Sequence, residues 1–154
     1  MTGYEIEGKG TYTLVLHLSD DTNIEVGALG SIEFDEGYYT YTGSAFGTGG
    51  LKRVERHRRV STGENDTRQW HIDHLNGNEE SSIHDAVVSL NVDVECEVSS
   101  LLREKKQVEP VENFGASDCD CSSHLVYFDS PPTNSVVESH RQASRDTGGS
   151  VKQL

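Results

Sequence analysis

A strand, a glycine-rich turn and a basic helix are expected in succession between residues 38 and 59, and this stretch constrains the fold most. Tyrosine and threonine at 38–42 favour a pleated strand, and glycines at 47, 49 and 50 end it. Leu51 and Val54 are spaced as on one face of a helix. The chain has a formal charge of −13, yet five of its 13 lysine and arginine residues lie between Lys52 and Arg59. Such a local concentration of positive charge predicts contact with an anion.

The acidic residues, 26 in number, are spread along the whole chain and outnumber the basic ones two to one. Dispersed acidity predicts a halophilic protein, because salt shortens electrostatic screening to about 3 Å at 1 M; an acidic mesophilic protein is the alternative. No apolar run approaches the roughly 20 residues needed to span a bilayer, and the N-terminus does not resemble a signal peptide. We therefore expect a cytoplasmic protein with no membrane partner and no obligate protein partner.

Two further apolar patterns complete the expected fold. Leu14, Leu16 and Leu18 alternate as in a half-buried strand, and the apolar run around residue 87 resembles a central strand. The prediction is an α/β fold with a small central antiparallel sheet (about 10–18, 38–43 and 84–92), flanked by helices at 51–60 and 95–106. Residues 129–154 are rich in Pro, Ser, Gly and charge, which predicts a disordered polar tail after a domain spanning 1–128.

Gly10-Thr11-Tyr12 and Tyr41-Thr42-Gly43 resemble the two halves of the motif that names the GIY-YIG nuclease superfamily, with threonine in place of each isoleucine. Ser44, Arg53 and Arg56-His57 continue the match in order. The segments 70–75, 95–97 and 117–125 look like the Uri-like branch, and the resemblance, to a halophilic archaeal-type member, covers about residues 8–128. Because 28 residues separate Tyr12 from Tyr41, more than in the usual hairpin, extra short strands are expected at 24–34.

The resemblance implies a metal-dependent endonuclease that hydrolyses phosphodiester bonds in DNA, as in DNA repair. One Mg²⁺ or Mn²⁺ would be held by a single glutamate, for which Glu97 is the first choice and Glu95 the second. Tyr12 would be the base, and Tyr41 would contact the phosphate or the water. Arg53 would stabilise transition-state charge, because a guanidinium grips phosphate bidentately. The further residues implied are His57 and His71 as proton relays, and Gly43, Ser44, Lys52, Arg56 and Arg59 as the nucleic-acid-binding group, with Gly43 allowing a tight turn into the helix.

The three cysteines permit a second kind of site. Their odd number in a chain without a secretion signal argues against a disulfide framework. With one histidine they form a candidate zinc set, although the Cys-x-Cys spacing is tighter than usual; its members are Cys96, Cys119, Cys121 and His124. Buried free thiols are the simpler reading. Two alternatives to the nuclease therefore stay open: a catalytically inactive nucleic-acid-binding module, and a zinc-stabilised interaction domain.

Overall fold

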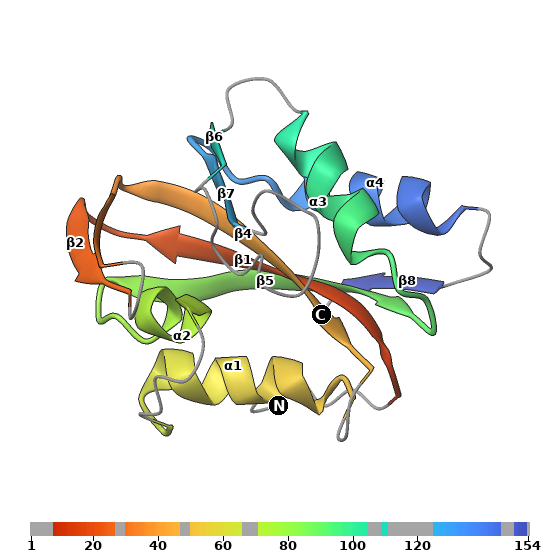
Figure 1. Ribbon diagram of the computed structural model, residues 1–154, viewed down its shortest axis with the longest axis horizontal. Coiled ribbons are helices and arrows are strands. Elements are labelled where there is room, and N and C mark those ends of the chain that lie inside the picture. Colours follow the sequence, from red (N-terminus) through yellow and green to blue (C-terminus); the bar gives the residue numbers. More distant parts are fainter. Residues whose placement is uncertain are drawn as a thin grey trace.

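A six-stranded antiparallel sheet forms the centre of the protein in a computed structural model (Figure 1). The structure describes residues 8–26, 30–46, 50–65, 71–104, 109–110, 125–145 and 150–153. The strand order is β6-β7-β4-β1-β5-β8. Their bounds are β1 (Gly10–Leu18), β4 (Gly37–Ala45), β5 (Ser81–Leu90), β6 (Glu109–Pro110), β7 (Leu125–Phe128) and β8 (Ser150–Gln153).

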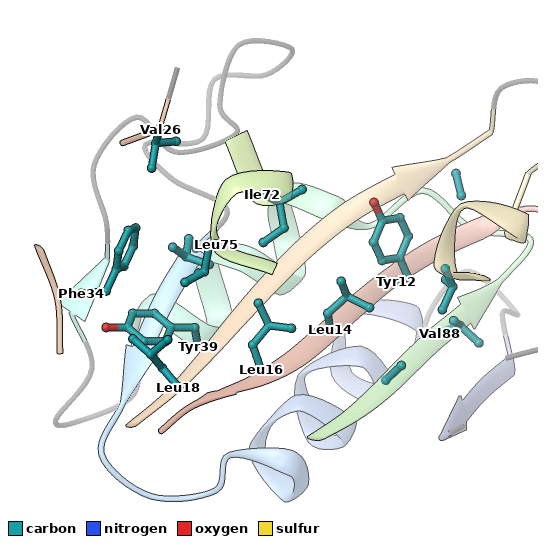
Figure 2. Packing of buried hydrophobic residues seen from close by; sticks show 14 of the residues in the cluster. Tyr12, Leu14, Leu16, Leu18, Val26, Phe34, Tyr39, Ile72, Leu75 and Val88 are labelled. Atoms are coloured by element: carbon teal, nitrogen blue, oxygen red, sulfur yellow. The ribbon is translucent and has the colours of Figure 1, made fainter. Parts of the chain in front are cut away.

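Helices cover both faces of this sheet. The helices α1 (Lys52–Thr62) and α2 (His71–Asn76) lie on one face, and α3 (Glu95–Arg103) and α4 (Thr133–Ser144) lie on the other (Figure 1). Because side chains alternate along a strand, β1 contributes to both layers. Leu14, Leu16 and Leu18 join the core beneath α1 and α2, as Figure 2 shows, whereas Val15 packs in the core beneath α3 and α4.

The α/β class predicted from sequence is confirmed. The three predicted strands correspond to β1, β4 and β5, and the two predicted helices correspond to α1 and α3. The extra strands are present too: β2 (Thr22–Glu25) and β3 (Ser31–Phe34) form a separate two-stranded sheet in the long connection between Tyr12 and Tyr41. Ile24 and Phe34 from this hairpin are buried in the same core as α2. None of the described helices is long and apolar enough to cross a membrane.

The predicted disordered tail over 129–154 is wrong for most of its length. Residues 133–144 form α4, and residues 150–153 form β8, which pairs with β5. The helix buries Val136, Ser139 and His140, whose spacing of three and four residues places them on one face. Only one of these three side chains is apolar, so the buried face was hidden in a composition typical of disorder.

Candidate functional site

Tyr12 and His57 form the buried centre of the candidate site. Tyr12 lies on β1, and His57 lies on the inward face of α1 with Val54 and Val60. The Tyr12 hydroxyl and His57 Nε2 share a hydrogen bond of 2.9 Å, and the two ring centroids are 5.3 Å apart. The apolar spacing that predicted the helix therefore also directs His57 toward the sheet.

Gly43 allows this arrangement by leaving space for the Tyr12 ring. The two residues face each other in the register of β1 and β4. A Cβ atom at position 43 would lie 2.5 Å from the Tyr12 hydroxyl oxygen, closer than real side chains approach. Gly43 was expected to form a tight turn into the helix, but it lies inside β4, which continues to Ala45. Its physical role is close approach by an aromatic ring rather than a change of chain direction.

Arg53 and Tyr41 border the Tyr12–His57 pair. Arg53 Nη1 donates a hydrogen bond of 2.8 Å to the backbone carbonyl of Ser44, which anchors the guanidinium to the end of β4. The same guanidinium is hydrogen-bonded to Tyr12. The Tyr41 ring centroid lies 6.1 Å from that of His57 in an edge-on contact. Four residues that the resemblance singled out thus meet at one end of the sheet.

Of the two candidate glutamates, Glu95 is the one whose charge influences Tyr12. Glu95, the first residue of α3, lies close enough to Tyr12 for its charge to raise the tyrosine pKa. Glu97 is exposed and lines a groove of about 500 Å³ together with α4 residues Gln142 and Ala143. Residues two positions apart on a helix point about 200° apart, so the two carboxylates face opposite directions. Of the two candidates from sequence, the second choice is therefore the one whose charge reaches Tyr12, and the first choice lines the groove against α4.

Burial keeps both partners of the central hydrogen bond uncharged. Burial, followed by the influence of Tyr41, raises the pKa of Tyr12 well above 10; the charge and hydrogen bond of Arg53 oppose this, and Glu95 adds to it. Burial also lowers the pKa of His57 to about 3, against the opposing effect of Asp73 and with help from Arg56 and Arg53. At neutral pH the site therefore contains a phenol and a neutral imidazole.

Much of the positive charge on α1 is compensated by acidic side chains. Arg56, predicted to contact DNA, donates two hydrogen bonds of 2.9 and 3.0 Å to the carboxylate of Asp73, which is fully buried on α2. Arg58 pairs with Glu55 and Glu64. Exposed cations of the predicted DNA-binding group are Lys52 and Arg59, and Arg59 lies 3.6 Å from Glu55.

Replacing Arg56 by methionine is expected to reduce the free energy of unfolding by about 3–5 kcal/mol, because it leaves the buried Asp73 carboxylate unpaired. Arg58→Met is the matched control, since both arginine side chains are 22% exposed and lie on the same helix. The acidic partners of Arg58 are themselves partly exposed and solvent-screened, so Arg58→Met should lower the free energy of unfolding far less than Arg56→Met does. Urea unfolding measures both values, and equal losses would contradict a special role for Asp73.

Cys96 is disulfide-bonded, although the number of cysteines argued against a disulfide framework. A sulfur atom in a disulfide cannot supply the thiolate that zinc requires, so Cys96 does not fit the candidate zinc set in this state. Cys119, Cys121 and His124 lie outside the described residues. Within the described part of the chain there is no group of three His, Cys, Asp or Glu side chains that could hold a metal. His71 begins α2, but its side chain is also outside the description.

A hard divalent cation nevertheless fits the chemistry of the described site. The available donors, the Glu95 carboxylate and the Tyr41 phenol, each influence the pKa of Tyr12. Both are oxygen donors, which Mg²⁺ and Mn²⁺ prefer. Mg²⁺ commonly binds through one or two carboxylates and keeps several waters, so a single glutamate is a sufficient anchor.

Comparison with known proteins yields one match. A family model described as "Domain of unknown function DUF123" matches residues 11–145. No curated protein and no solved structure matches the chain. The matched range runs from β1 through α4, so it includes every described residue of the site and also the helix that sequence composition had assigned to a tail.

Proposed function

The chain belongs to the DUF123 family, and we propose that it acts as a divalent-metal-dependent endonuclease that hydrolyses phosphodiester bonds in DNA, as a repair nuclease does. One observation carries this proposal. Two tyrosines, an arginine and a histidine, contributed by β1, β4 and α1, meet at one end of the sheet, where the charge of Glu95 from α3 also reaches Tyr12. The resemblance to GIY-YIG nucleases supports the same activity.

Phosphodiester hydrolysis requires a positioned water, a proton acceptor and stabilisation of charge on the phosphate oxygens. Arg53 is suited to the last task because its guanidinium is permanently charged and can bind two phosphate oxygens. Its hydrogen bond to the Ser44 carbonyl fixes its orientation before substrate binds. This preorganisation is what makes such a charge effective in a transition state.

Exposure distinguishes the two tyrosines. Tyr12 is only 1% exposed, whereas Tyr41, Arg53 and Glu95 are half-buried. A DNA strand would therefore contact Tyr41, Arg53 and Glu95 first, with the Tyr12–His57 pair behind them. We assign the water contact to the Tyr41 phenol, and to Tyr12 and His57 the hydrogen bond that supports the site from inside the sheet.

Glu95 would hold the divalent cation. When bound, the cation would polarise the phosphate and stabilise the departing oxygen. For the residues of this chain, neutralising the Glu95 carboxylate removes one of the influences that raise the pKa of Tyr12. The Arg53 charge lowers the same pKa, so both effects act against the rise in the Tyr12 pKa that burial and Tyr41 cause.

Binding of DNA would rely on few protein cations. The exposed Lys52 and Arg59 side chains on α1 are available to contact the backbone, whereas Arg56 is bound to Asp73. Each phosphate contact contributes to the salt dependence of binding. A small number of contacts in a chain of charge −13 predicts weak association that becomes weaker still as salt increases.

The test is incubation of the full chain with duplex, flap, branched and damaged DNA in Mg²⁺ or Mn²⁺, with EDTA as the metal-free reference. Arg53→Ala is expected to lower the cleavage rate by about 10²-fold or more, the magnitude typical of one transition-state donor. Arg58→Ala removes an equal charge from the same helix and should retain cleavage. Binding without cutting on every substrate would favour the inactive binding module, and cleavage that survives Arg53→Ala would point to another site or a contaminant.

A further inference from the structure

The side chain of Thr11, on β1, forms hydrogen bonds to the turn between β5 and α3. Its hydroxyl donates a hydrogen bond of 3.0 Å to the carbonyl of Val92 and accepts one of 2.9 Å from the N–H of Val94. Thr11 is fully buried. A second hydrogen bond holds the same turn just before β1 begins, where the N–H of Asn91 donates to the carbonyl of Lys9 at 2.8 Å.

This attachment fixes the start of α3. Val94 is the residue before the helix, and its carbonyl accepts the first helical hydrogen bond, from Val98 N–H at 2.9 Å. Valine has no side-chain oxygen to cap the helix, so the hydrogen bond from its N–H to Thr11 orients the Asp93–Val94 peptide, at the entry to the helix. Asn91, in a left-handed conformation with φ of 64°, makes the preceding chain reversal.

Thr11 and Tyr12 are neighbours on β1, and their side chains point to opposite faces of the sheet. One face of this strand therefore holds the tyrosine, and the other holds the turn that delivers Glu95 to the same end of the sheet. Resting on the proposed function, we infer that Thr11 is a positioning residue that holds the Glu95 carboxylate in place for the divalent cation beside Tyr12, Tyr41 and Arg53.

The chain provides a matched control for the stability of buried threonines. Thr13 lies on the same strand and face, is fully buried, and bonds to Thr42 Oγ1 at 2.9 Å and His140 Nε2 at 2.8 Å. Neither partner belongs to the turn before α3. Thr11→Val and Thr13→Val each preserve the side-chain shape and leave buried polar groups unpaired, so both should destabilise the fold. Only Thr11→Val should change the position of the Glu95 carboxylate.

The experiment compares the unmodified chain with Thr11→Val, Thr11→Ser and Thr13→Val. It measures Mn²⁺ affinity by calorimetry, the Mn²⁺ dependence of DNA cleavage, and the Tm. Thr11→Val is expected to weaken Mn²⁺ binding and raise the Mn²⁺ concentration for half-maximal cleavage by about tenfold, as loss of a ligand-orienting group does. Thr11→Ser, which keeps the hydroxyl, should restore both values. Thr13→Val should lower Tm and leave the Mn²⁺ dependence unchanged.

Unchanged Mn²⁺ affinity and dependence in Thr11→Val, alongside active unmodified protein, would overturn the role of Thr11 and leave the endonuclease proposal intact. Absence of both cleavage and Mn²⁺ binding in the unmodified chain would overturn the two together. If Thr11→Val does not fold, Thr11→Ala takes its place, because it leaves room for a water between Val92 and Val94; the expected direction is the same, and no change in Mn²⁺ dependence would again overturn the role.

Discussion

Glu95→Gln is expected to reduce Mg²⁺-dependent cleavage by about 10²–10³-fold, whereas Glu97→Gln should leave it within about twofold. Glutamine keeps the size of glutamate and removes the negative charge that would hold the cation, and each factor of ten corresponds to about 1.4 kcal/mol of lost transition-state stabilisation. The charge of Glu95 contributes to the raised pKa of Tyr12, whereas Glu97 lines the groove between α3 and α4. Single-turnover cleavage with saturating DNA measures both variants.

This pair is well matched because the two substitutions are chemically identical and lie in the same helical turn. A general effect of charge on the helix would change the cleavage rate of both variants by the same factor, since both acids are in the first turn of α3. A larger loss of cleavage in Glu97→Gln would indicate that Glu97, the first choice from sequence, holds the metal. It would contradict the role proposed for Glu95. Equal losses would indicate an effect on the helix rather than on a ligand.

Acid is expected to destabilise the fold beginning near pH 6.5, through two buried histidines. Burial lowers the pKa of His57 to about 3 and that of His140 to about 3, while an unfolded histidine titrates near 6.5. Below about pH 6.5 the unfolded state therefore binds more protons than the folded state. The stability that the two uncharged histidines contribute to the folded state is fully present above that pH and is lost as pH falls toward about 3. At pH 5 the loss should reach about 2 kcal/mol for each histidine, or about 4 kcal/mol together.

Urea unfolding between pH 8 and pH 4.5 measures this loss of stability. Histidine variants separate the contribution of the histidines from that of the carboxylates, which also bind protons as pH falls. His140 lies between Thr13 Oγ1 and Ser89 Oγ, which contact its two ring nitrogens at 2.8 and 2.7 Å. His140→Gln should be less stable at pH 8 but should lose about 2 kcal/mol less on acidification to pH 5 than the unmodified chain. An identical pH slope in the variant would show that His140 takes up its proton alike in the folded and the unfolded chain, which would contradict the lowered pKa.

The central part of this fold could be predicted from sequence because its signals are local. Alternation at Leu14, Leu16 and Leu18 indicates β1, and the spacing of Leu51 and Val54 indicates α1. The motif halves place Tyr12 and Tyr41 on neighbouring strands, and the structure brings both to His57. Short-range periodicity is sufficient wherever one apolar face is buried.

The features that sequence missed depend on contacts between distant residues. The choice between Glu95 and Glu97 follows from where α3 begins, and that start is fixed by Thr11, more than eighty positions earlier in the chain. The pairing of Arg56 with Asp73 joins two helices and leaves no spacing pattern in either of them. The face of α4 packs through serine and histidine, which composition alone assigns to solvent.

The burial of β1, in the middle of the sheet, also determines where the chain can accept insertions and deletions. β1 is buried along nearly its whole length, with the tyrosine and leucines serving one layer and Thr11, Thr13 and Val15 serving the other. Deleting a single residue within it would exchange the two sets of side chains between the layers. We therefore expect natural variants and engineered libraries to tolerate insertions in the β2–β3 hairpin and to reject any change of length in β1.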